Sequence, residues 1–178
     1  TLVGPVNWIC NSILVNQNKG YSEMGVYNAA NQWFSVIIFF PSIVSNTLLP
    51  ILTEKIAMNE NNKTARILKY SILINVLIVV PFILIFIFFS GTIMNLYGKG
   101  CTGYELVLIY TLITAGLLAI QNPIGNLIAA SGKMWLGFAM NLTWGIAFIL
   151  LTLLQSNSGS EGISLARLLS YVLLAILQ

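Results

Sequence analysis

The fold is decided by the stretch Gly25-Val-Tyr-Asn-Ala-Ala-Asn-Gln-Trp-Phe-Ser-Val-Ile-Ile-Phe-Phe-Pro-Ser-Ile-Val-Ser-Asn-Thr-Leu-Leu-Pro50. It has no Lys, Arg, Asp or Glu from Gly25 to Thr53, and a helix of about 20 apolar residues is enough to cross a bilayer. Yet it carries several amide side chains and a central proline, Pro41. A buried amide without a hydrogen-bond partner costs about 1–3 kcal/mol. We therefore expect these amides to face other helices or a water-filled cavity, and Pro41 to bend the helix.

The composition is that of an integral membrane protein. Of its 178 residues, 57% are hydrophobic and only 7% are charged, whereas soluble domains contain about 25% charged residues. The chain has no His and no Asp, which leaves few groups for acid–base or metal chemistry, so we expect a transporter without a metal site or a cofactor. The net charge of +3 is small and scattered, which argues against a nucleic-acid partner.

The apolar runs predict an all-α bundle of about six membrane spans. We expect a charged loop with a short amphipathic turn over residues 53–70, a glycine-rich loop over 91–103, and a tight turn at 131–133 that forces its two spans into a hairpin. Because both ends of the sequence fall in apolar runs, we expect residues 1–178 to be one fragment of a longer membrane protein. The expected spans run from before residue 1 to about 16, then 24–52, 71–90, 104–130, 134–154 and 163–178.

Orientation follows from the lysines and arginines of alternating loops, which are enriched on the cytoplasmic side. One side holds five of these residues and the other holds three. We expect the side with five to be cytoplasmic. The five are Lys55, Lys63, Arg66, Lys69 and Lys133, and the three are Lys19, Lys99 and Arg167.

Polar residues inside the spans are the candidates for a transport path. Several of them fall on shared helical faces, at spacings of three or four residues. Each pair either bonds a neighbouring helix or lines a cavity, and the spacing alone does not separate these alternatives. The candidates are Asn7 and Asn11 with Trp8 beside them, Asn28 and Gln32 in a stripe with Ser35, and Asn122 and Asn126 around the second internal proline, Pro123.

Arg167 lies about one turn inside the last apolar run. A guanidinium group matches phosphate oxygens well, so Arg167 could face a phosphate; alternatively, its long side chain could reach the nearby membrane interface. No ionisable side chain lies deep in the second to fifth spans, where proton relays and ion-coupled pumps usually place one. These residues therefore offer no obvious proton path.

Several motifs together resemble one family. Residues 25–33, the Ile-Ile-Phe-Phe-Pro run ending at Pro41, and Leu48-Leu-Pro50 are similar to the Wzx-type O-antigen and polysaccharide flippases. These flippases belong to the multidrug/oligosaccharidyl-lipid/polysaccharide exporter superfamily. Leu96-Tyr-Gly98, Ala130-Ser-Gly-Lys133, Gly137-Phe and Asn141 add to the resemblance, which covers most of the chain.

The resemblance implies a two-lobe transporter of about twelve helices, of which this chain is most of the C-terminal lobe. The implied function is the transfer of an undecaprenyl-pyrophosphate-linked oligosaccharide, the O-antigen repeat unit of lipopolysaccharide, from the cytoplasmic to the periplasmic leaflet of the bacterial inner membrane. Alternating access around a central cavity would carry the substrate, with membrane lipid, a polysaccharide polymerase and a chain-length regulator as partners. Asn7, Trp8, Asn11, Asn28, Gln32, Asn122, Asn126 and Arg167 would line the path, and Pro41 and Pro123 would supply bends for lobe movement.

Three alternatives remain open. An exporter of drugs or cations with the same fold is expected to carry a carboxylate inside the membrane. An integral-membrane O-antigen polymerase is expected to have a larger extracytoplasmic loop with catalytic charged residues. A scaffold that transports nothing leaves the polar stripes unexplained.

Overall fold

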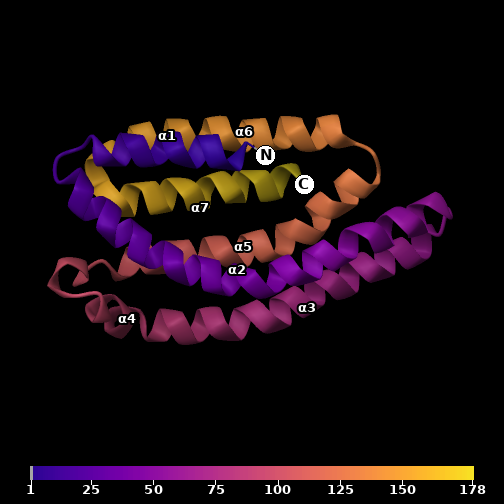
Figure 1. The fold of residues 1–178 in the computed structure, drawn as a ribbon, viewed down its shortest axis with the longest axis horizontal. Helices are drawn as coiled ribbons and strands as arrows, with labels where there is room; N and C mark the ends of the chain where they lie inside the picture. The colour runs from indigo at the N-terminus through magenta and orange to yellow at the C-terminus, as the bar shows by residue number, and fades with distance from the viewer. Residues whose placement is uncertain (1) are drawn as a thin grey trace.

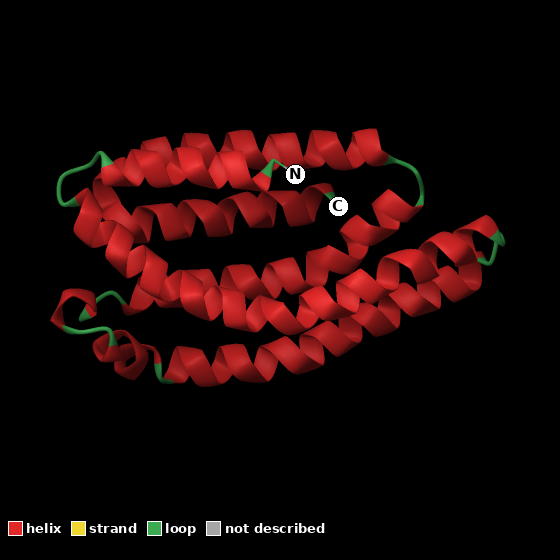
Figure 2. Ribbon diagram, in the orientation of Figure 1, coloured by secondary structure: helices red, strands yellow, loops and turns green. Residues whose placement is uncertain are grey.

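The structure is a computed structural model that describes residues 2–178, and these residues are almost entirely helical (Figures 1 and 2). The expected all-α membrane bundle is confirmed. Thr1, within the first expected span, lies outside the described residues. The elements are α1 Val3–Val15, α2 Gly20–Ala57, α3 Asn61–Phe88, α4 Ser90–Leu96, the short 3₁₀ helix η1 Lys99–Cys101, α5 Glu105–Ala130, α6 Met134–Leu154, the 3₁₀ helix η2 Ser156–Ser158, and α7 Gly159–Leu177.

Helix α5 is the centre of the bundle. It packs against α2, α3 and α7, while α6 and α7 pack together and α1 lies on α6 (Figure 1). Its residues Val107, Leu108, Leu112 and Ala115 are completely buried. The core is therefore built around one helix that touches most of the others.

Five helices are long and apolar enough to cross a membrane, and α1 is a shorter apolar helix. The α2–α3 and α5–α6 turns lie at one end of the bundle, and the α1–α2 and α6–α7 connections lie at the other (Figure 1). The two groups of loops that the charge count separated thus sit at opposite ends. The assignment of the lysine-rich end to the cytoplasm stays a prediction.

The main difference from the expected elements lies at residues 53–70. Only residues 58–60 of this segment form a turn: α2 continues to Ala57 and α3 already begins at Asn61, so the α2–α3 hairpin projects beyond the neighbouring helices (Figure 1). Glu, Lys and Arg are good helix formers. Charged residues therefore end the membrane-embedded part of α2 and α3 without ending the helices.

Candidate functional site

The outer surface of α2 carries a row of polar side chains. Val26, Ala30 and Ile37 turn inward and are at most 4% exposed, whereas the opposite side of the helix is exposed. We call this side the α2 polar face and define it by Asn28, Gln32, Ser35 and Asn46, all four of which are exposed. The expected stripe therefore exists, and it points away from the core of the bundle.

Helices α3 and α6 expose mainly apolar side chains, unlike the α2 polar face. The exposed side chains in the apolar parts of α3 and α6 are almost all aliphatic or aromatic, including Leu77 at 64%, Phe88 at 83% and Leu150 at 55%. Such surfaces suit a bilayer, where exposed amides are unfavourable.

Polar groups within membrane segments usually face a bundle interior or a water-filled cavity. Gln32 Oε1 already accepts a hydrogen bond from the Tyr97 hydroxyl at 3.0 Å, and the Ser35 hydroxyl donates to the Asn31 carbonyl at 3.0 Å. The remaining amides of the α2 polar face, Asn28 and Asn46 above all, therefore need a cover other than lipid chains.

Helix α1 contributes a partly similar surface. Trp8 is 71% exposed, while Asn7 and Asn11 are half-buried. The Asn7 Nδ2 donates to the Val3 carbonyl of its own helix at 2.8 Å. Within the described residues no hydrogen bond joins Asn7 or Asn11 to α2, although α1 and α2 pack against each other and both lie toward the viewer in Figure 1.

Amides on either side of Pro123 in α5 bond to two different neighbouring helices. Asn126 Nδ2 donates to the Ser45 carbonyl of α2 at 2.9 Å, so this candidate residue joins α5 to α2. Asn122 is half-buried. Gln121 Nε2, which was not among the candidates, donates to the Tyr171 carbonyl of α7 at 2.7 Å.

A third amide, that of Asn75, compensates for the hydrogen bond that Pro123 cannot make. Pro123 has no N–H, so the Ala119 carbonyl four residues earlier lacks its usual helical donor. Asn75 Nδ2 of α3 donates to that carbonyl at 2.8 Å, and Asn75 is completely buried. In Figure 1 the C-terminal part of α5 turns away from α2 toward α6. The second proline of the expected pair, Pro41, is buried within the continuous helix α2.

Arg167 sits inside the bundle, with an exposed fraction of only 7%. Its Nη1 donates to Asn31 Oδ1 at 2.7 Å and lies 3.4 Å from the Tyr27 hydroxyl, and its guanidinium carbon is 4.1 Å from the centre of the Phe34 ring. All of these partners belong to α2. One of the two expectations was that the side chain reaches the membrane interface. The structure instead buries it, and it joins α7 to α2.

The charge of Arg167 is balanced by dipoles and an aromatic ring. The three ion pairs found among residues 2–178 all involve Glu54 or Glu60 near the α2–α3 turn. The Nε of Arg167 is buried without a hydrogen-bond partner. The Asn31 amide, the Tyr27 hydroxyl and the Phe34 ring thus surround the Arg167 guanidinium group. All three partners are neighbours in sequence of Asn28, Gln32 or Ser35 of the α2 polar face.

Comparison with known proteins identifies relatives. The MatE family profile matches residues 7–154. An "EPS I polysaccharide export inner membrane protein EpsE" of Ralstonia nicotianae is 27% identical over 180 residues, and the protein of the same name from Ralstonia solanacearum is 26% identical over 181 residues. Both alignments cover 98% of this chain and 40% of the relative. The chain therefore spans about two fifths of the length of these relatives.

No solved structure matches the chain. Both relatives are named as inner membrane proteins, and the five membrane-length helices agree with the expected multi-pass inner membrane location. The resemblance to the exporter superfamily is confirmed, while the narrower Wzx assignment stays a prediction. Because the family profile covers most of its residues, the chain belongs to the MatE family.

Proposed function

We propose that this chain forms the C-terminal lobe of a two-lobe exporter for an oligosaccharide carried on undecaprenyl pyrophosphate. The exporter moves this substrate from the cytoplasmic to the periplasmic leaflet by alternating access. Membership of the MatE family and two relatives named for polysaccharide export support this choice. The proposed partners are membrane lipid and, after transfer, a polysaccharide polymerase and a chain-length regulator.

The single observation that carries the proposal is the α2 polar face. From Asn28 to Asn46 it extends over 18 residues, or about 27 Å at 1.5 Å per residue. That length is close to the thickness of the hydrocarbon core, about 30 Å. The amides give a sugar hydrogen-bond partners near both ends of this crossing, and the exposed Phe39 and Ile43 lie on the same side between them.

Amides suit this task because each one both donates and accepts hydrogen bonds. A sugar that leaves water must exchange its hydrogen bonds for others, or lose about 1–3 kcal/mol for each unpaired group. We propose that the second lobe covers the α2 polar face and the exposed Trp8 of α1, which leaves a cavity between the lobes. Bends at Pro41 and Pro123 would then let the helices adjust as the lobes rock.

The test uses the full-length protein in its host. A deletion strain is complemented with the triple variant Asn28→Ala, Gln32→Ala, Asn46→Ala or with a matched control, Val36→Ala, Ile43→Ala, which changes exposed apolar positions of the same helix. Lipid-linked repeat units are quantified in each leaflet by mass spectrometry, with surface polysaccharide and protein level measured in parallel. We expect unpolymerised units to accumulate in the cytoplasmic leaflet of the triple variant alone.

Other outcomes overturn the proposal in different ways. If the triple variant is produced at a normal level and makes normal polysaccharide, the α2 polar face does not line the transport path. Unpolymerised units in the periplasmic leaflet of the deletion strain would indicate a polymerase. Unchanged polysaccharide in the deletion strain would point to a different exported substrate.

A further inference from the structure

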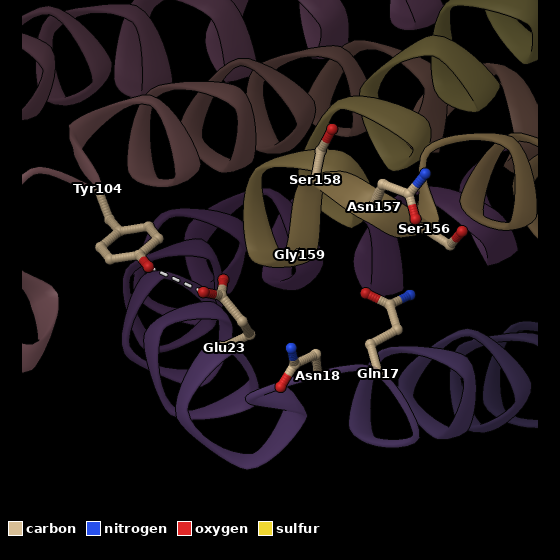
Figure 3. Close-up of a pocket in the computed structure, with 8 residues that line it drawn as sticks. All are labelled: Gln17, Asn18, Glu23, Tyr104, Ser156, Asn157, Ser158 and Gly159. Atoms are coloured by element: carbon tan, nitrogen blue, oxygen red, sulfur yellow. Dashed lines mark hydrogen bonds between the residues drawn. The ribbon is translucent and has the colours of Figure 1, made fainter.

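A polar pocket lies at the end of the bundle where the α1–α2 and α6–α7 connections meet (Figure 3). Its volume is about 480 Å³, within the range of about 300–1,000 Å³ for ligand sites. It is separate from the α2 polar face, which does not contribute to its walls. The lining residues are Gln17, Asn18, Glu23, Tyr104, Ser156, Asn157, Ser158 and Gly159.

The Glu23 carboxylate holds the walls of this pocket together through hydrogen bonds. Its Oε2 accepts hydrogen bonds from the backbone N–H of Ser160 at 2.8 Å and from the Ser160 hydroxyl at 2.6 Å, and its Oε1 accepts one from the Tyr104 hydroxyl at 2.8 Å. One carboxylate thus joins the beginnings of α2, α5 and α7. Gly159 has a φ of 55°, and a Cβ there would come within 2.6 Å of the carboxylate. This wall is therefore closely packed and accepts only glycine at that position.

Five other polar side chains that line the pocket have no hydrogen-bond partner among the described residues. Gln17 and Asn18 from the α1–α2 loop lie across the opening from Ser156 and Asn157 of η2 (Figure 3). Within residues 2–178, these four side chains and the Ser158 hydroxyl make no hydrogen bond to another residue. The pocket therefore presents neutral donors and acceptors on two opposed walls, with the Tyr104 ring beside them.

We propose that this pocket binds a single sugar unit of a carbohydrate. Free amides and hydroxyls on a fixed frame match a ligand rich in hydroxyl groups, which needs donors and acceptors in equal measure. A cation is a poorer match, because both oxygens of the Glu23 carboxylate already accept hydrogen bonds. The proposal rests on the proposed export function, and it adds a receiving site for the substrate at the end predicted to face the periplasm.

The position on α2 supports this role. Glu23 precedes Asn28, the first residue of the α2 polar face, by five residues, which is about 7.5 Å of helix rise. Along the helix axis the pocket therefore lies about one sugar length beyond the outer end of the α2 polar face. Glu23 itself is on the inward side of α2, with the buried Tyr27 and Ala30, so a sugar would have to pass around the start of α2 to reach the pocket. The pocket would hold the sugar after it leaves the cavity.

The test measures occupancy of the pocket directly. Full-length protein in nanodiscs, freed of other reactive cysteines, carries Ser158→Cys as a reporter for a membrane-impermeant maleimide. The probes are methyl glycosides of hexoses and of N-acetylhexosamines. A probe at ten times its Kd leaves about a tenth of the sites free, so the labelling rate should fall about tenfold.

Two variants make the result specific. Thr102→Cys, an exposed position at the same end but outside the pocket, should be labelled at the same rate with and without probe. Adding Gln17→Ala and Asn157→Ala to the reporter should abolish protection. The proposal is overturned if no glycoside slows labelling of Ser158→Cys, if Thr102→Cys is slowed equally, or if the double substitution leaves protection intact. Because labelling does not depend on export, its outcome is scored separately from that of the α2 variants.

Discussion

Asn75 supplies the hydrogen bond that Pro123 cannot make, and a double-mutant cycle can measure its value. The first change is Asn75→Leu, which keeps a similar volume but leaves the Ala119 carbonyl without a donor. Both Asn75 and Ala119 are at most 1% exposed, so water does not replace the lost bond. The second change, Pro123→Ala, restores a backbone N–H four residues after that carbonyl.

The magnitude follows from the burial of the two groups. Hydrogen bonds between membrane helices average about 0.6 kcal/mol and reach about 1.7 kcal/mol. An unsatisfied buried acceptor costs about 1–3 kcal/mol. Since the Ala119 carbonyl has no helical donor, we expect a loss near 1.5 kcal/mol, or about tenfold in the unfolding equilibrium. In the Pro123→Ala background the loss should shrink, which gives a coupling energy of about 1 kcal/mol.

The assay is unfolding of the full-length protein by dodecyl sulfate in mixed micelles, followed by tryptophan fluorescence. The unpaired Oδ1 of Asn75 disappears in both backgrounds and so cancels in the cycle. Additive effects of the two substitutions would refute the reasoning. They would mean that the bond to Ala119 does not compensate for the proline.

Three further predictions concern other contacts. Arg167→Met should lower the free energy of unfolding in the same assay by about 1–3 kcal/mol, because Asn31 loses its donor, and Arg167→Lys should not restore it, since an ammonium lacks the planar fork; full rescue by lysine would contradict this. Glu23→Gln should speed amide hydrogen exchange at the start of α7, because the charged acceptor there is lost, and unchanged exchange would show that the tie is not needed. A hydrogen bond from Lys63 holds the pKa of Glu60 below its ordinary value of 4.5, so the stabilisation of the α2–α3 turn by Glu60 is present above that value and is lost as the pH falls through the lower, folded-state pKa. The protection factors of the turn amides, which compare exchange with the intrinsic rate at each pH, should therefore fall at acid pH. Lys63→Gln should reduce this fall, while Lys55, 3.5 Å from Glu60, preserves part of it; an undiminished fall in the variant would contradict the role of Lys63.

The apolar runs were sufficient to predict the bundle and the order of its membrane-length helices, but not α4 and η1, which occupy most of the expected glycine-rich loop at 91–103. They did not predict how far α2 and α3 extend, because hydropathy reports the preferred solvent of a segment and not whether its backbone is helical. Of the charged residues from Glu54 to Lys69, all but Glu60 lie within α2 or α3. Helix propensity, considered together with hydropathy, predicts longer helices at both positions.

The candidate site was predictable in part. The spacing of Asn28 and Gln32 predicted a shared stripe, but only the packed structure shows that this stripe lies opposite the buried side of α2. The contacts of Asn75 and Glu23 depend on residues 44 and 137 positions away, respectively. Local patterns carry no information about such partners, so the contacts of Asn75 and Glu23 could not be predicted from the sequence.

The amides on the outside of α2 also bear on how the protein is made. When α2 leaves the ribosome, nothing yet covers those groups, and its insertion into the bilayer on its own is penalised for each of them. Helix α3 follows after only the three residues 58–60, and it is the most apolar of the five membrane-length helices. The two can therefore enter the membrane together as a hairpin, with the favourable transfer of α3 offsetting the cost of α2. A segment built to contact sugar would thus depend on its neighbour in the chain for its place in the membrane.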